Sequence, residues 1–389
     1  MVNFEDTATA FITKSNAQLK KAYYMFKIVA NPSLVSFGKK ASAISMGLGL
    51  PIRGLVKKTV YDQFVGGENI LECDETIDKL NEHNVKCLLD YSVEGKVKEE
   101  DFENTKNILI QTIKYGKNKE AIPFTVFKVT GLARFSLLEK VSRNAQLNSS
   151  EEKEWFRVQK RVEQICQTAY DVDLAVLIDA EESWIQNAID GLAEEMIRKF
   201  NEEKVVIYNT LQMYRKDRLN YLKNQVEEAN KVGYYLGVKL VRGAYMEKER
   251  ERALKNNIDS PIQETKADTD RDYDAGVKYI VDNLRLGAIV AGTHNENSCK
   301  KLVDAMLERG LPKNDERVWF SQLFGMSDNL SFNLAKDGYN VVKYLPFGPV
   351  KETLPYLIRR AEENTAAAGQ TSRELDLIKK EMQRRGLKS

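Results

Sequence analysis

From residue 85 onward the sequence repeats one theme, in which a short apolar run rich in β-branched residues precedes a segment with helical periodicity. The eight apolar runs are Val85–Tyr91, Phe124–Val129, Leu174–Ile178, Val205–Tyr208, Leu236–Val241, Ala288–Ala291, Val318–Phe320 and Val341–Tyr344, and the helical segments include Asp190–Asn201, Leu219–Lys231, Tyr273–Leu284 and Asn297–Arg309. Apolar strands that alternate with helices are typical of a parallel sheet covered on both faces. Eight repeats favour a closed (β/α)8 barrel, and an open doubly wound sheet is the alternative.

The composition suits one large barrel with smaller flanking pieces. The chain has 389 residues, of which 42% are hydrophobic, and this is enough for one large core. A net charge of +2 gives no reason to expect a nucleic-acid partner, and two histidines with no C-x-x-C pair argue against a metal site. We expect a basic N-terminal helical arm over residues 1–64, a barrel over residues 65–365 and a C-terminal helical tail over residues 366–389.

The N-terminal arm is the most basic part of the chain, because residues 1–60 hold nine Lys or Arg residues against Glu5 and Asp6. A basic and partly apolar segment can lie on an anionic membrane surface, whereas the alternative is a pair of helices packed on the edge of the barrel. The start of the chain lacks the pattern of a secretory signal, and the uncharged stretch 41–52 is too short to span a bilayer. We therefore expect a cytoplasmic protein. If the arm binds lipid, the protein would be peripheral at the inner face of the membrane.

Polar side chains lie in or just after the last residues of the predicted strands, from the second strand to the eighth. They are Lys128, Asp179, Gln212, Lys239, Arg242, His294, Gln322 and Tyr344. In (β/α)8 barrels the chemistry takes place at the carboxyl ends of the strands, so these groups share one rim. No G-x-G-x-x-G or P-loop motif follows any strand, so the site would hold a cofactor without the common nucleotide-binding fingerprints.

A helical segment with two adjacent arginines follows the last strand. Tyr356, Arg359, Arg360 and Glu363 have the spacing of one helix face, and Pro355 suits a helix if it lies in the first turn. The planar guanidinium groups suit a carboxylate ligand, which they can bind through paired hydrogen bonds. The alternative is a solvated face stabilised by weak pairs such as Arg359 with Glu363.

Five groups of residues resemble the motifs of the proline dehydrogenase family, and they occur in the order that the family has. They are Tyr344-x-Pro346-x-Gly348 followed by Tyr356–Arg360 and Glu363-Asn364; Leu240–Tyr245; Thr293–Asn295; Phe64–Glu68; and Gln322-Leu323-x-Gly325-Met326. The resemblance covers roughly residues 60–365. It implies a distorted (β/α)8 TIM barrel that binds FAD, with its last helix over the barrel mouth.

The resemblance also implies a role for individual residues. Those expected at the substrate are Arg359, Arg360 and Lys128 on its carboxylate, Tyr344 and Leu323 as pocket walls, Asp179 beside Lys128, and Glu68 as the partner of Arg359. Lys239 falls near the reactive nitrogen of the flavin, at a position where bifunctional relatives have arginine. Expected FAD contacts are Ala180, Gln212, Val241, Arg242, Gly243, Ala244, Lys266, Thr269, Thr293, His294, Asn295, Gln322 and Glu363. Judged from its own pattern, His294 is equally well explained as a hydrogen-bonded histidine with no ligand.

The activity implied by the resemblance is FAD-dependent oxidation of L-proline to 1-pyrroline-5-carboxylate, the first step of proline catabolism to glutamate. Electrons would pass to a membrane quinone, and a separate pyrroline-5-carboxylate dehydrogenase would take the product. The alternatives are a hydroxyproline dehydrogenase of the same superfamily, another flavin barrel of the methylenetetrahydrofolate reductase type, and a non-catalytic membrane-associated barrel.

Overall fold

The computed structural model describes residues 2–29, 54, 57–93, 97–366 and 368–388. Side chains are described for these residues except 29, 58, 59, 361–366 and 368–371. The uncharged N-terminal stretch 41–52 therefore lies outside the described residues.

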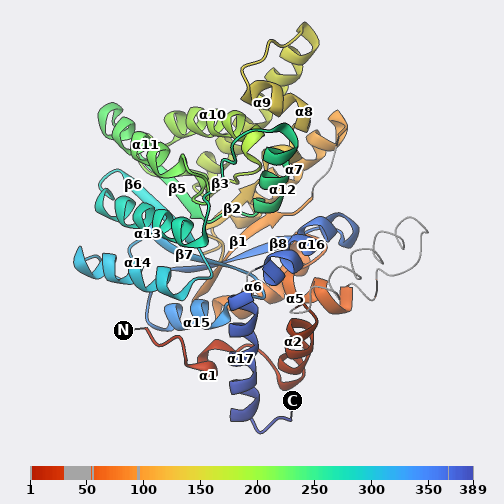
Figure 1. Ribbon diagram of the computed structural model, residues 1–389, viewed down its shortest axis with the longest axis vertical. Helices are drawn as coiled ribbons and strands as arrows, with labels where there is room; N and C mark the ends of the chain where they lie inside the picture. Colours follow the sequence, from red (N-terminus) through yellow and green to blue (C-terminus); the bar gives the residue numbers. More distant parts are fainter. Residues whose placement is uncertain (1, 30–53, 55–56, 94–96, 367, 389) are drawn as a thin grey trace.

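Eight parallel strands form a closed barrel in chain order, with β8 hydrogen-bonded to β1 (Figure 1). The strands are β1 (Val85–Tyr91), β2 (Phe124–Phe127), β3 (Ala175–Ile178), β4 (Ile207–Gln212), β5 (Leu236–Val241), β6 (Gly287–Gly292), β7 (Val318–Leu323) and β8 (Val341–Phe347). This confirms the predicted TIM barrel and excludes the open sheet.

Strand β4 lies further along the chain than its apolar run indicated. The side chain of Asn201 accepts hydrogen bonds from the backbone N–H groups of Val206 and Ile207, at 3.0 and 2.9 Å, and fixes the start of the strand. The later residues of β4 are polar although they are buried. Asn209 donates a hydrogen bond to Asp190 of a covering helix at 3.0 Å. A search for apolar runs misses such a strand because its polar side chains are paired inside the protein.

Helices surround the barrel. They are α6 (Asp74–Asn81), α7 (Glu99–Gly116), α8 (Phe135–Ser142), α9 (Ser149–Val172), α10 (Ser183–Phe200), α11 (Arg218–Val232), α12 (Met246–Asn256), α13 (Lys266–Asp282), α14 (Glu296–Glu308) and α15 (Asp328–Lys336). Local sequence fixes several of their starts. Asn148 and Glu151 form a reciprocal capping box at α9, and the side chain of Asn295 caps α14.

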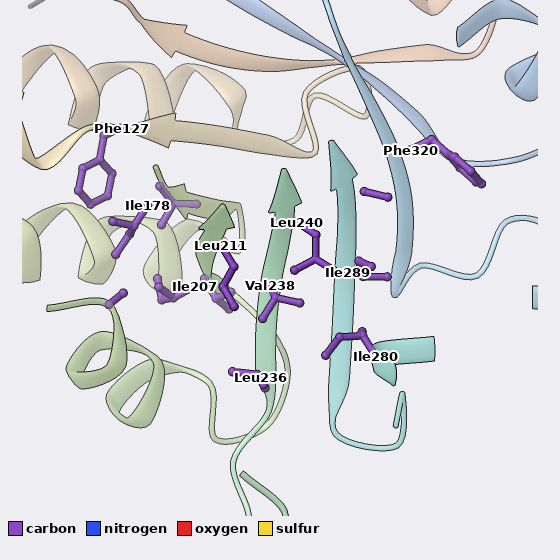
Figure 2. Packing of buried hydrophobic residues seen from close by; sticks show 14 of the residues in the cluster. Phe127, Ile178, Ile207, Leu211, Leu236, Val238, Leu240, Ile280, Ile289 and Phe320 are labelled. Carbon is purple, nitrogen blue, oxygen red and sulfur yellow. The ribbon is translucent and has the colours of Figure 1, made fainter. Parts of the chain in front are cut away.

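Alternation along the strands divides the core into two layers. Strand side chains that point outward pack under the helices, and Figure 2 shows part of this layer, including Ile178, Leu211 and Leu240 of the strands and Ile280 of α13. Side chains that point inward fill the barrel, and they include Leu88, Phe124, Val126, Leu177, Tyr208, Val290 and Val342. The barrel is therefore a packed core, and polar chemistry is confined to its rim.

The two ends of the chain pack together on one side of the barrel. Figure 1 shows α17 (Ala368–Arg384) beside α2 (Asn16–Val29), with the short helix α1 (Thr7–Ala10) and α15 nearby. Glu5 pairs with Arg373 and Lys380 of α17. The described part of the N-terminal arm therefore packs on the C-terminal tail and on the barrel. Within the described residues, no helix has both the length and the apolar character needed to cross a membrane.

Helix α16 (Val350–Ala366) lies over the barrel mouth. Its residues Tyr356 and Leu357 are buried in the same cluster as Tyr344 and the inward-pointing strand residues. Pro355 does not lie in the first helical turn, where a proline would suit a helix, because α16 begins at Val350 and Pro355 lies inside it. Its ring cannot donate a hydrogen bond to the preceding turn, but the helix continues because its buried face is held by packing.

Candidate active site

The barrel rim is organised around the carboxylate of Asp179, directly after β3. The ammonium group of Lys128, after β2, donates to Asp179 Oδ2 at 3.2 Å, and the hydroxyl of Tyr344 on β8 donates to the same oxygen at 3.0 Å. Lys239 on β5 pairs with the other oxygen, Oδ1. Lys128 also lies 3.1 Å from the Tyr344 hydroxyl. Four strands thus bring together four residues that the sequence analysis placed at one site.

Charge decides the protonation of this cluster. Burial raises the pKa of Asp179, but the opposing effect of Lys239 and Lys128 is greater and holds that pKa well below its usual range. Burial and the Asp179 carboxylate raise the pKa of Tyr344 well above its usual value. Asp179 is therefore ionised and Tyr344 is neutral at physiological pH, so the cluster presents two ammonium groups held by one carboxylate.

The sequence analysis missed Asp90, a second carboxylate at this rim. Asp90 lies near the end of β1, is 1% exposed, accepts a hydrogen bond from the Ser92 hydroxyl and is 3.8 Å from Lys128 Nζ. Burial raises its pKa. A cavity of about 10 Å³, lined in part by Ser92 and Lys128, lies beside it, and this is roughly the space of one water molecule. The signal that would have found Asp90 is its position near the end of a strand, the same signal that identified Asp179.

Arg242, at the end of the β5 region, is held in place from three sides. It donates to Asp270 at 2.7 Å, to Thr293 Oγ1 at 2.7 Å and to Ser298 Oγ at 2.9 Å. Lys266, whose side chain is 73% exposed, pairs with the same Asp270 at 2.5 Å. The side chains expected to contact the phosphates and the adenosine of a dinucleotide therefore share one carboxylate.

Gly243 lies where the main chain passes close to an aromatic ring. This residue has φ of +132°, and a Cβ atom would lie 2.5 Å from the Tyr214 ring. A side chain cannot be accommodated at residue 243, because the Tyr214 ring occupies the space that its Cβ atom would take.

Two buried glutamines tie the rim loops together. Gln212 donates to the Glu181 carbonyl at 2.6 Å and accepts from the Ala244 backbone N–H at 3.3 Å. Gln322 donates to the Thr293 carbonyl at 3.1 Å and accepts from Ser331. Of the other expected FAD contacts, Ala180 and Val241 are half-buried and Thr269 is buried. Hydrogen bonds from these two glutamines thus link β4 to the residues after β3 and β5, and β7 to the residue after β6.

His294 follows β6 and is partly buried. Its Nδ1 atom lies 2.9 Å from the hydroxyl of Ser327. Burial, with the positive charges of Lys343, Arg360 and Arg242, lowers the pKa of His294 to about 3. The imidazole is therefore neutral at physiological pH, and Asn295 beside it caps α14 through its side chain.

The arginine pair extends from α16 toward this rim. Arg360 is buried, its guanidinium lies 5.1 Å from the centre of the Tyr356 ring, and its charge contributes to the low pKa of His294. Arg359 is half-buried, and Leu323 packs against the cluster that contains Tyr344. The side chain of Glu363 lies outside the described side chains.

Glu68 lies in a segment attached to the end of β8, because Gly348 N–H donates to the Gly67 carbonyl at 3.0 Å. Its carboxylate pairs with Lys57 at 2.7 Å. The pairing of Glu68 with Arg359 stays a prediction.

A closed barrel with a buried charge cluster at its rim and a cationic helix over its mouth defines a TIM-barrel enzyme. A family model described as proline dehydrogenase matches residues 73–373, and the chain belongs to this family of oxidoreductases.

Several curated proteins are similar to this chain over most of its length. Carbapenem antibiotics biosynthesis protein CarD of Pectobacterium carotovorum subsp. carotovorum is 34% identical, over 86% of this chain and 86% of that protein. Mitochondrial proline dehydrogenase 1 of Dictyostelium discoideum is 31% identical over 98% of this chain and 74% of that protein. Hydroxyproline dehydrogenase of Xenopus laevis is 30% identical over 96% and 88%.

A solved structure has the same fold. It is proline utilization A (PutA) of Bdellovibrio bacteriovorus inactivated by N-propargylglycine, with a TM-score of 0.72 and 20% sequence identity. The match covers 92% of this chain and 38% of that protein, so the chain spans less than half of its length.

The charge cluster predicts a large stability cost for Asp179→Ala. The substitution leaves Lys239 and Lys128 close together in a buried site without the carboxylate between them, and breaking a buried pair in this way costs about 3–5 kcal/mol. Urea unfolding of the ligand-free protein measures the change. The double variant Asp179→Ala with Lys239→Met should recover part of the loss, because it also removes a buried charge. A cost below about 1 kcal/mol for the single variant would contradict the account.

Proposed function

We propose that this protein catalyses FAD-dependent oxidation of L-proline to 1-pyrroline-5-carboxylate, the first step of proline catabolism to glutamate. The observation that supports it best is the cluster of Lys128, Lys239 and Tyr344 on Asp179, beneath the helix that carries Arg359 and Arg360. This arrangement offers positive charge for a carboxylate and an aromatic wall for a small ring in the same place. Membership of the proline dehydrogenase family supports the same substrate.

In this proposal the substrate carboxylate binds to Arg359, Arg360 and Lys128. Tyr344 and Leu323 are the walls that pack against the pyrrolidine ring. Asp179 keeps Lys128 charged and oriented, because it is ionised and accepts a hydrogen bond from that ammonium group. Fixing the carboxylate and the ring together places one C–N bond of proline in a defined position, and such positioning supplies much of the rate in reactions of this kind.

The residues of the rim fit an FAD. The proposed contacts are Ala180, Gln212, Lys239, Val241, Arg242, Gly243, Ala244, Lys266, Thr269, Thr293, His294, Asn295, Gln322 and Glu363. Arg242 would bring a cation to a negatively charged pyrophosphate, and Lys266, which shares Asp270 with it, would lie on the adenosine side. FAD, when bound, supplies the acceptor for the hydride. The neutral His294 would offer a hydrogen bond without adding charge.

We further propose that the electrons pass to a membrane quinone and that a separate pyrroline-5-carboxylate dehydrogenase takes the product. Peripheral contact at the inner face of a membrane would bring the enzyme to the quinone. Helix α2 supports this contact, because Lys20, Lys21, Tyr24, Lys27 and Ile28 are exposed along it at helical spacing. In this scheme residues 1–64 are the membrane-facing arm, 65–365 the catalytic barrel and 366–389 the tail.

A second candidate is a hydroxyproline dehydrogenase, which the similarity to the Xenopus laevis enzyme of that name favours. Tyr344 favours proline. Its hydroxyl is committed to Asp179 and its ring is buried, so an additional hydroxyl on the substrate would lose water against an aromatic surface.

The basic face of α2 predicts binding to anionic vesicles. The double variant Lys20→Glu with Lys27→Glu should sediment less with vesicles that contain an acidic phospholipid, and rising salt should release the wild type because it screens the attraction. Lys231→Glu, an exposed lysine at the end of α11, is the matched control and should bind as the wild type does. Equal binding of all three proteins would remove α2 from the proposed membrane contact.

The proposed reaction predicts that L-proline bleaches the flavin absorbance of the FAD-loaded protein without oxygen. Arg360→Met should retain FAD but need about ten- to hundredfold more proline for the same bleaching, since a charge-assisted bond contributes ~1.5–3 kcal/mol. Arg309→Met, which removes an exposed arginine of a surface ion pair, should respond as the wild type does. A flavin that proline does not reduce would rule out the proposed function.

The role of Tyr344 predicts a preference for proline over 4-hydroxyproline of about 10- to 200-fold in kcat/KM. Tyr344→Ser should narrow this ratio, chiefly by losing proline activity, because the aromatic packing is lost. Tyr344→Phe keeps the ring and separates its effect from that of the hydroxyl on Asp179. Steady-state kinetics with both substrates on the wild type and the two variants shows whether the Tyr344 ring sets the substrate preference. A ratio that stays constant in Tyr344→Ser would leave hydroxyproline open as the natural substrate.

A further inference from the structure

Ser327 connects the C-terminal helix to the barrel rim. It lies directly before α15 and has φ of +50°, a left-handed conformation that is uncommon for residues other than glycine. Its backbone N–H donates to the carboxylate of Glu374 in α17, and its hydroxyl lies 2.9 Å from His294 Nδ1. One residue therefore joins a helix 47 positions away to the imidazole proposed as an FAD contact.

Glu374 is buried at this junction, with 5% of its surface exposed. The charged groups around it are Asp328 of α15 and Lys343 of β8, which pair at 2.8 Å, and Lys14 from the N-terminal segment, which pairs with Asp328 at 3.2 Å. Burial, with the nearby Asp328, raises the pKa of Glu374 to about 7. Burying a carboxyl group costs free energy of folding unless the group is hydrogen-bonded. The hydrogen bond from Ser327 N–H offsets part of this cost and fixes the position of Ser327.

Residues other than Glu374 hold α17 against the rest of the protein. Leu377, Ile378 and Met382 are buried in the apolar cluster, and Arg385 donates to the carbonyl of Phe11 at 2.9 Å. Glu381 is fully buried on the same helix and holds Arg385 in position. The helix therefore has an apolar and polar anchor that does not include Glu374, and the contact of Glu374 with Ser327 is available for a separate role.

We propose that Glu374 is a positioning residue for the cofactor site, which holds Ser327 in its left-handed conformation and so fixes the imidazole ring of His294. This inference rests on the proposed function, in which His294 contacts FAD. The Ser327 hydroxyl fixes the plane of the ring whichever nitrogen carries the proton, and the second nitrogen is then directed to the ligand. The C-terminal helix thereby becomes part of the site without touching the cofactor.

The test uses Glu374→Ala, Glu374→Gln and the matched control Glu381→Ala in the 389-residue chain. The first readout is the dissociation constant of FAD, measured by adding FAD to the flavin-free protein. The second is NMR of the histidine side chains in the flavin-free protein. The chain has only two histidines, so their signals can be told apart. The ring centres of His83 and Phe332 of α15 are 6.0 Å apart, so the His83 signal reports whether α15 itself has moved.

Glu374→Ala should weaken FAD binding about five- to tenfold and shift the His294 signals while the His83 signals stay in place. Glu374→Gln should restore both, because its amide oxygen can still accept from Ser327 N–H, and Glu381→Ala should leave both as in the wild type. Ser327→Gly tolerates the backbone conformation and removes the hydroxyl, so it should reproduce the effect with α17 still docked.

Unchanged His294 signals in both Glu374→Ala and Ser327→Gly would overturn the inference. Equal effects of Glu381→Ala and Glu374→Ala would also overturn it, because they would reduce the role to anchoring the helix. Failure of the wild type to bind FAD would contradict the proposed function instead, and the histidine signals of the flavin-free protein would still decide whether Glu374 positions His294.

Discussion

The rim of this barrel depends on the ionised carboxylate of Asp179, which holds Lys128 and Lys239 next to each other in a buried place. Two neighbouring ammonium groups repel each other, and the shared carboxylate offsets the free-energy cost of burying both. The barrel provides the geometry, because β2, β3 and β5 deliver the three charges to one rim. Tyr344 completes the arrangement from β8 and brings an aromatic surface beside the charges. A carboxylate and a small ring are the two features of a ligand that this surface can bind together.

Both ends of the chain contribute to the same rim from outside the barrel. Lys14 reaches Asp328, which pairs with Lys343 of β8, and Glu374 of α17 holds Ser327 next to His294. The region near the β7 and β8 loops is therefore stabilised by segments that lie far apart in the sequence. Substitutions in the arm or the tail can therefore act on the site through these contacts. Of the residues in these contacts, only Lys343 lies on a strand.

Periodicity and strand ends predict most of the barrel, since β1 and β5 have the bounds of their apolar runs. They fail for β4, whose buried polar residues find partners such as Asp190 only in the folded chain. The residues around Asp179 could be predicted because each lies on a strand or directly after one, whereas the pairing of Glu374 with Ser327 spans 47 positions and leaves no local pattern. Pro355 shows the same limit, because the packing of α16 on the mouth, and not the local preference of proline, sets where the helix begins.

The most direct test of the account is a comparison of L-proline with L-prolinamide, which has the same ring but lacks the negative charge. If Lys128 and the arginines of α16 bind the carboxylate, the kcat/KM for the amide should be lower than that for proline by a factor of about ten to one hundred. The pyrrolidine ring is the same in both compounds, so the difference reports the replacement of the carboxylate. Equal kcat/KM values for proline and its amide would contradict the claim that the buried charges of the rim select the substrate.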